Sequence, residues 1–128
     1  MINFNKDSAW DLVPIPEKSV HPNLMRLLLP EEELVAAFKT VRDQFIFTDR
    51  RLISVDVQGI TGKRVSFSIL PYANIQYFAV QTPFALELFK DSELDLWFSN
   101  GMHAHFEFRG DVDILRIGQL ISEYVLTK

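Results

Sequence analysis

The chain has 128 residues, 48% of them hydrophobic, which is the size and composition of one globular domain with its own core. Its net charge of −4 argues against a general nucleic-acid binder, because neutralising phosphates requires a basic surface. The chain has no cysteine, which excludes disulfides, thiolate metal sites and thiol nucleophiles and suits a reducing compartment. We therefore expect a cytoplasmic protein without bound nucleic acid.

Residues 1–27 are expected to form an arm laid over the domain together with a short helix. Pro14, Pro16 and Pro22 interrupt any long helix in this region. A short helix is expected at residues 23–29, because the residue before a proline is pushed away from helical conformation. The stretch lacks the basic-then-apolar pattern of a secretory signal, and no apolar run in the chain approaches the roughly 20 residues that span a bilayer.

Residues 28–128 are expected to form the domain itself, because the hydrophobic pattern there changes to a period of two. It predicts seven strands, at residues 34–39, 44–48, 52–57, 64–70, 75–81, 93–99 and 104–109. Apolar residues then recur at helical spacing, which predicts a helix over residues 112–126 with Asp111 as its N-cap. Short strands followed by one helix indicate a mainly β, antiparallel barrel or sandwich.

The clearest alternation is in ELDLWFSNGMHAHFEFR, residues 93–109. The predicted inner face is apolar (Leu94, Leu96, Phe98, Ala104, Phe106 and Phe108), and the outer face is polar apart from Trp97. A two-residue turn at Asn-Gly would place core and solvent residues on one face, so we expect a three-residue loop, 100–102, with positive φ at or beside Gly101. That register sets Trp97 opposite His105, and Glu93 opposite Arg109.

The same parity argument applies to QFIFTDRRLISVDVQG, residues 44–59. A three-residue loop, 49–51, would pair the inward residues (Phe45, Phe47, Ile53 and Val55) with one another. Ile46 and Leu52 would then point outward. In the next strand, the apolar residues at alternate positions (Val65, Phe67 and Ile69) are expected in the core.

A long run, TVRDQFIFTDRRLISVDVQGITGKRVSFSILPYANI, is followed by an acidic and apolar strand, HFEFRGDVDI and an amphipathic helix. Together they resemble the bacterial pleckstrin-homology (PH) domain family over approximately residues 28–126. The resemblance implies a PH-like barrel of seven antiparallel strands in two sheets, capped by the C-terminal helix. It also implies an interaction module rather than an enzyme, assembled as a cyclic homo-oligomer, for example a pentamer, and serving an unidentified protein partner.

Two histidines and several serines are the candidates for metal binding and catalysis. His103 and His105 project to one side of a strand near Asp95 and Glu107, so a carboxylate-histidine metal site is conceivable. Polar residues on the solvent face of a hairpin explain the same spacing, and we expect no metal and no cofactor. No nucleophile elbow, Ser-His-Asp arrangement or phosphate-binding glycine loop is recognisable, so we expect no catalytic residues and no enzymatic activity.

Outward apolar residues are the better indication of function. Ile46, Leu52 and Trp97, with His105 opposite the tryptophan, are the predicted interface residues, since tryptophan is enriched at binding hot spots. Two kinds of cover explain them: the arm or short helix of the same chain, or a neighbouring subunit. Closing a ring requires two different patches on each protomer, such as a sheet face and a strand edge.

The charge is uneven along the chain. Between residues 39 and 64 six basic residues face three acidic ones, which leaves the remainder at −7. Part of this cluster could attract anionic lipid head groups, as in eukaryotic PH domains (Lys39, Arg42, Lys63 and Arg64). Each basic residue adds only about 1 kcal/mol near a membrane, so such contact would be weak. In the alternative interpretation, Arg50, Arg51 and Lys63 are solvated turn charges that protect strand edges.

Overall fold

The computed structural model describes residues 8–58, 64–83 and 91–127. Its elements are, in chain order, β1 (Ser8–Pro14), η1 (Glu17–Ser19), α1 (Pro22–Leu27), β2 (Leu34–Lys39), β3 (Asp43–Thr48), β4 (Arg51–Gln58), β5 (Arg64–Pro71), η2 (Tyr72–Asn74), β6 (Ile75–Gln81), β7 (Ser92–Phe98), β8 (His103–Phe108) and α2 (Ile114–Thr127). The mainly β class is confirmed, and every predicted strand and helix is present with bounds within two residues of those expected.

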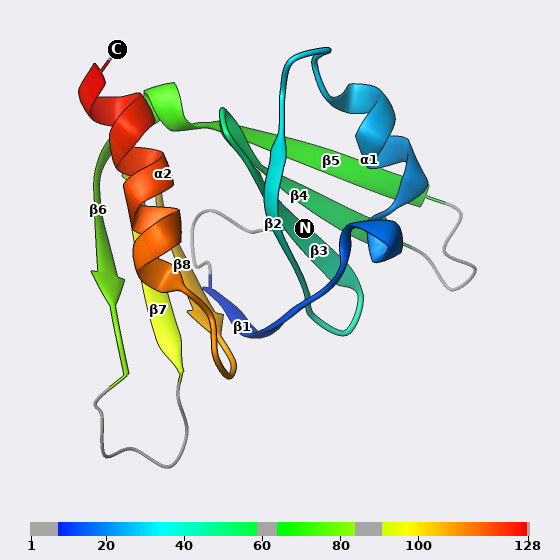
Figure 1. Ribbon diagram of the computed structural model, residues 1–128, viewed down its shortest axis with the longest axis horizontal. Helices are drawn as coiled ribbons and strands as arrows, with labels where there is room; N and C mark the ends of the chain where they lie inside the picture. Colours follow the sequence, from blue (N-terminus) through cyan, green and yellow to red (C-terminus); the bar gives the residue numbers. More distant parts are fainter. Residues whose placement is uncertain (1–7, 59–63, 84–90, 128) are drawn as a thin grey trace.

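The structure has eight strands in one sheet, whereas seven strands in two sheets were predicted. Eight strands follow one another in the hydrogen-bonded order β5-β4-β3-β2-β1-β8-β7-β6. All neighbours are antiparallel except β1 and β8, which are parallel. Figure 1 shows two diverging halves, β2–β5 and β6–β8, with β1 between them. The two halves are therefore joined through a strand of the arm.

The strand missing from the prediction is β1, because its sequence carries no regular alternation of apolar and polar residues. Asp11 adopts a positive φ of 56°, and the pairing with β8 shifts register between Ala9 and Leu12. Such a bulge interrupts the alternation of side chains that identifies a strand. Leu12 nevertheless points into the main core and is fully buried. The arm is thus part of the sheet and does not simply lie over it.

The main core fills the space between the two halves. Phenylalanines from both halves meet edge to face there, with ring centroids 4.7 Å apart for Phe38 and Phe108 and 5.6 Å apart for Phe45 and Phe106. Full burial of each such side chain contributes roughly 1.5–3 kcal/mol. Tyr72 is also fully buried, and its hydroxyl donates to the Thr48 carbonyl at 2.8 Å. The core therefore holds the β2–β5 half against the β6–β8 half.

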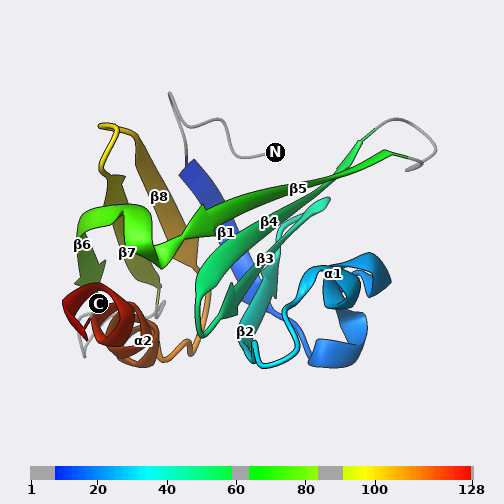
Figure 2. The ribbon, with the colours of Figure 1, turned by 90° about the horizontal axis from the view of Figure 1, so that it is seen from above.

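The C-terminal helix α2 covers the inner face of β6–β8 (Figures 1 and 2). It inserts its predicted apolar face, including Ile114, Ile117 and Ile121, into the main core. The predicted N-cap is two residues early: Asp113, not Asp111, accepts a hydrogen bond from the Arg116 N–H at 3.1 Å. The predicted role of the helix as a cap on the sheet is confirmed.

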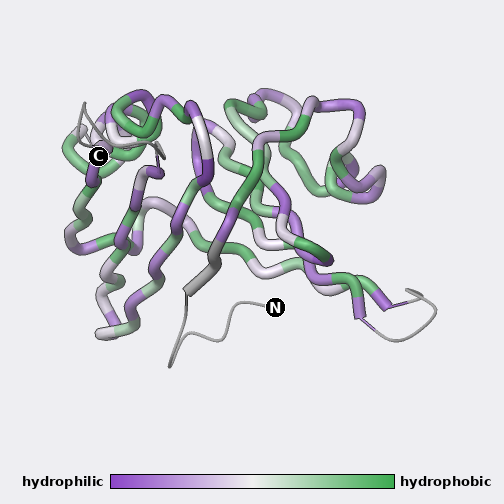
Figure 3. The backbone as a smooth tube through the Cα atoms, turned by 90° about the horizontal axis from the view of Figure 1, so that it is seen from below, coloured by the Kyte–Doolittle hydropathy of each residue, from purple (hydrophilic) through white to green (hydrophobic). Residues whose placement is uncertain are grey.

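A second, smaller core lies on the opposite face of β2–β5, under α1 and the segment before it. Its buried members are Val20, Leu24, Ala37, Ile46, Ile53 and Val55. Figure 3 shows hydrophobic segments on both sides of the molecule, in α1 as well as in α2 and the strands. The β2–β5 half therefore buries apolar side chains on both of its faces.

Candidate interaction surface

The β6–β8 half has one buried and one open face. In β7 and β8 the side chains alternate as predicted, and the apolar set is buried (Leu94, Leu96, Phe98, Ala104, Phe106 and Phe108). The intervening side chains are only partly buried. Among the described residues, the main core and α2 pack against the inner face of this half.

Three stacked rings occupy one end of this outer face. Trp97 of β7 lies parallel to Tyr77 of β6 and to His103 of β8, with ring centroids 4.5 Å apart in both pairs and interplanar angles of 8° and 14°. The strand register places these three residues side by side. Tyr77 is 55% exposed. We call Tyr77, Trp97 and His103 the aromatic platform.

Titratable side chains continue from the aromatic platform along β7 and β8. Asp95 Oδ1 lies 2.8 Å from both His103 Nε2 and His105 Nδ1. His105 Nε2 lies 3.5 Å from Glu93 Oε1. Burial, followed by the negative charges of Glu93 and Asp91, raises the pKa of Glu107. The face therefore combines an aromatic end with a carboxylate-histidine end.

The register of the β7–β8 hairpin differs from the predicted one by two residues. Trp97 pairs with His103 instead of His105, and Glu93 pairs with Glu107 instead of Arg109. The loop does have three residues, with Gly101 at φ 87°, but it ends one residue earlier because the Phe98 N–H donates to the Met102 carbonyl at 2.8 Å. Parity, and hence the assignment of faces, was correct, whereas the cross-strand partners were wrong.

The predicted exposure of Ile46 and Leu52 is wrong, because both are 0% exposed within the single chain. The β3–β4 turn has two residues, and Phe47 pairs with Leu52 while Ile46 pairs with Ile53. Leu52 consequently faces the main core, and Ile46 faces the second core under α1. Cover by the chain itself, the first of the two explanations above, accounts for both residues.

Some residues of β5, the strand that follows β4, were also predicted on the wrong face. Leu70 is buried in the main core, whereas Val65 and Phe67 pack against the second core. Ile69 is 40% exposed on the same side of β5. The expected single core face was wrong because this half of the sheet has two.

Arg51 is not the solvated turn charge of the alternative interpretation. Its guanidinium donates to both carboxylate oxygens of Glu32 at 2.9 Å, and the Glu32 side chain is fully buried. The Thr48 hydroxyl donates to the same carboxylate at 2.6 Å. Burial alone would raise the pKa of Glu32, but these hydrogen bonds hold it below its ordinary value. This buried ion pair ties the segment after α1 to the β3–β4 turn.

The predicted anion-binding residues lie at one end of the β2–β5 half. Lys39, Arg42 and Arg64 are exposed, and Lys63 lies outside the described residues. Two acidic residues, Asp43 and Asp56, are paired across β3 and β4 at this same end. Burial and the neighbouring Asp56 carboxyl raise the pKa of Asp43. Within the described part of the chain, no helix is both long and apolar enough to cross a bilayer.

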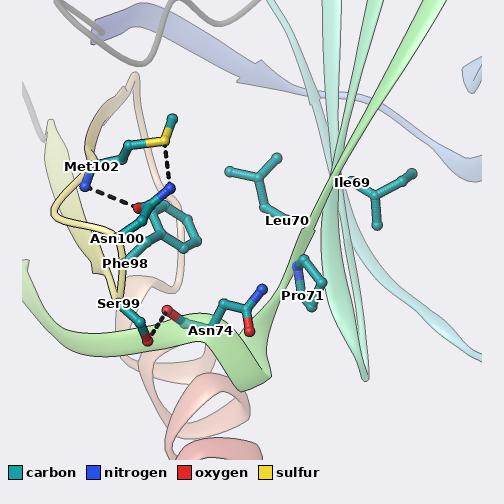
Figure 4. A pocket seen from close by; sticks show the side chains of 8 residues that line it. All are labelled: Ile69, Leu70, Pro71, Asn74, Phe98, Ser99, Asn100 and Met102. Atoms are coloured by element: carbon teal, nitrogen blue, oxygen red, sulfur yellow. Dashed lines mark hydrogen bonds between the residues drawn. The ribbon is translucent and has the colours of Figure 1, made fainter.

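A pocket of about 370 Å³ opens between the end of β5 and the β7–β8 loop (Figure 4). Leu70 points toward Phe98 and Met102, and Asn74 closes one side through its carbonyl, which accepts from the Ser99 hydroxyl at 3.1 Å. The described lining residues carry no ionisable side chain. Its chemistry suits an apolar group rather than a charged ligand.

Comparison with known proteins decides the family. A sequence model of the family described as "Bacterial PH domain" matches residues 4–125. The chain belongs to the bacterial PH domain family. The matched region includes β1, so the family's domain extends further toward the N-terminus than the resemblance seen in the sequence.

Relatives of this PH domain are uncharacterised or known from their structures. "Uncharacterized protein YjqA" of Bacillus subtilis (strain 168) is 49% identical over 81 residues, a match that spans 63% of this chain and 63% of that protein's length. A DUF1696 family protein with a pleckstrin-homology domain from Shewanella loihica PV-4 is 31% identical, with a TM-score of 0.71 over 90% of this chain and 97% of that one. The pleckstrin homology domain from Shewanella amazonensis SB2B is 37% identical, with a TM-score of 0.58 over 86% and 88%. The PH-like fold is thereby confirmed.

Two residues of this PH domain's outer face escaped sequence reasoning. Tyr77 joins the platform only through the β6–β7 register, which the sequence between these strands does not determine. Glu93 lies beside His105 and Glu107 because of the register shift in the β7–β8 hairpin. The alternation of ELDLWF predicted that Glu93 faces outward, but the predicted register gave it the wrong partner, Arg109 instead of Glu107.

Proposed function

We propose that this PH domain is a non-enzymatic module that binds copies of itself in the cytoplasm, forming a cyclic homo-oligomer. The observation that carries the proposal is the aromatic platform, in which Tyr77 is 55% exposed and Trp97 and His103 are only partly buried. Stacked aromatic side chains on an otherwise polar face are the kind of surface that protein interfaces cover, because they contribute large contact area at little entropic cost.

A ring requires a second, different patch on each protomer. The open edge of β5 is suited to this role, since β5 is an outermost strand of the sheet. An edge strand carries backbone groups able to pair with another chain. Ile69 of β5 is 40% exposed, so it adds apolar surface beside this edge. In this arrangement the platform of one copy contacts the β5 edge of the next.

Size-exclusion chromatography with multi-angle light scattering tests self-association. We expect a discrete oligomer for the wild-type protein and a monomer for Trp97→Glu and Tyr77→Glu, because a charge at the centre of the contact removes hot-spot energy of about 2 kcal/mol or more. Leu115→Glu is the matched control: Leu115 is 62% exposed on α2, away from the platform. This variant should retain the wild-type mass.

A monomeric wild-type protein at high concentration would overturn the proposal. Dissociation caused equally by Leu115→Glu would show that the platform is not the contact surface. Near-UV circular dichroism of each variant establishes that a change in mass does not come from unfolding. Ile69→Glu separately tests the β5 edge, and it should also yield a monomer if each interface joins two different patches.

The second candidate function is weak binding of anionic lipid head groups. The observation that favours it is the register, which brings Lys39, Arg42 and Arg64 to one end of β2–β5. Sedimentation with vesicles containing phosphatidylserine should then show salt-sensitive binding that is lost in the Lys39→Glu, Arg42→Glu double variant. Absence of binding at low salt would remove this candidate, and the Asp43–Asp56 pair at the same end argues in that direction.

A further inference from the structure

The carboxylate-histidine end of the outer face has the composition and spacing of a metal site. Glu93 of β7 and His105 and Glu107 of β8 each offer one ligand atom, and these atoms lie within 4.8 Å of one another. In a tetrahedral zinc site with bonds of 2.0–2.2 Å, ligand atoms are about 3.4 Å apart. The 3.5 Å between His105 Nε2 and Glu93 Oε1 already fits this spacing.

Asp95 fixes the orientation of the histidine. Its Oδ1 lies 2.8 Å from His105 Nδ1, and since a carboxylate oxygen accepts, Nδ1 carries the hydrogen. A histidine with its Nδ1 hydrogen directed at a carboxylate can bind a metal through Nε2, and Nε2 is the atom beside Glu93. Metal-binding histidines commonly donate their other ring N–H to a carboxylate in this way.

The two glutamates of this cluster repel each other. Glu93 and Glu107 stand directly opposite each other on neighbouring strands, and like charges in that position destabilise a sheet. Both side chains are partly buried, which weakens the screening of their repulsion by water. A divalent cation between them would offset this repulsion.

We propose that Glu93, His105 and Glu107 bind one divalent transition-metal ion, with Asp95 as the positioning residue for His105. The imidazole favours zinc and its first-row neighbours over magnesium and calcium, which prefer oxygen ligands alone. With three protein ligands, a fourth position is open for water. All of these residues belong to one chain, so metal binding does not depend on the proposed self-association.

Isothermal titration of Zn²⁺ into tag-free protein tests the site. We expect one ion per chain, and a dissociation constant raised about tenfold or more by His105→Gln and by Glu107→Gln. Asp95→Asn should keep the stoichiometry and weaken binding by roughly 10- to 100-fold, as expected for an outer hydrogen-bond partner. His21→Gln is the control, because it removes a histidine at the N-cap of α1, outside the β6–β8 half, and should leave the affinity unchanged.

Two results would overturn the proposal. One is the absence of saturable one-to-one binding by the wild-type protein; the other is binding that survives His105→Gln but is lost in His103→Gln. The visible spectrum of bound Co²⁺ gives a second readout, which Glu107→Gln should change and His21→Gln should not. Near-UV circular dichroism of each variant checks the fold, and if His105→Gln is unfolded, Glu93→Gln and Glu107→Gln decide the matter.

Discussion

The two halves of the sheet differ in how many of their faces are buried. In β6–β8 one face lies against α2 and the main core, and the other carries the platform and the carboxylate-histidine residues. In β2–β5 both faces are apolar, one against the main core and one under α1. The β6–β8 half therefore offers a whole sheet face for the proposed contacts, whereas the β2–β5 half offers only its β5 edge and one end. Substitutions should separate the two.

The largest effect is expected in the β2–β5 half, at the buried ion pair. Arg51→Ala should reduce the free energy of unfolding by about 3–5 kcal/mol, because it leaves the Glu32 carboxylate buried without its partner. Arg50→Ala, at the exposed neighbouring position, should change it by less than about 0.5 kcal/mol. Urea unfolding measures both. Equal effects would mean that the pair contributes nothing beyond a surface charge.

Two isoleucines of the β2–β5 half provide a matched comparison. Ile46→Ala should cost about 2–5 kcal/mol, because it opens a cavity in the second core. Ile69→Ala, at a position 40% exposed, should cost clearly less. Urea unfolding of the two variants at one protein concentration checks this. Equal losses of stability in the two variants would contradict the placement of Ile46 in the second core.

The pH dependence of the unfolding free energy should reveal the contribution of Glu32. Its pKa is lowered in the folded protein, so its contribution is fully present above its unfolded value of about 4.5 and is lost as the pH falls below it. The difference in unfolding free energy between wild type and Glu32→Gln should therefore be constant near neutral pH and shrink in acid. Urea unfolding across a pH series measures it, and a difference that grows in acid would contradict the assignment.

The smallest expected effects concern one buried serine in each half. Among the described residues, Ser54 Oγ and Ser92 Oγ are buried without a hydrogen-bond partner. Ser54→Ala and Ser92→Ala each remove an unsatisfied hydroxyl and should leave stability unchanged or raise it by about 1 kcal/mol or less. Thermal unfolding is sufficient to detect the sign. A loss of stability would indicate that the hydroxyl binds a buried water.

Sequence reasoning succeeded where one face of a strand meets solvent. Leu94, Leu96 and Phe98 alternate with Glu93, Asp95 and Trp97, so faces and strand bounds could be predicted there. It failed between β3 and β4, because residues on both faces of these strands are apolar. The alternation of polar and apolar residues that distinguishes the two faces is therefore missing there. The turn was decided instead by the Thr48 hydroxyl, which accepts from the Arg50 and Arg51 N–H groups at 3.1 and 3.0 Å.

The candidate site was less predictable than the fold, because it depends on cross-strand partners. Trp97 and His105 were identified from their faces, yet the two-residue shift of register gave each a different neighbour. The shift comes from one backbone hydrogen bond, between Phe98 and Met102, that leaves no mark on the alternation. The parallel pairing of β1 with β8 is likewise a contact between distant segments that local patterns do not contain.

That parallel pairing has a consequence for biosynthesis. Ser8 is in register with His105, so β1 can pair with β2 early but cannot pair with β8 until residue 105 has left the ribosome. The β2–β5 hairpins can form earlier, from segments close in sequence, but their union with β6–β8 must wait. Since long-range strand pairing also slows folding, closure of the sheet between β1 and β8 should be a late step in folding.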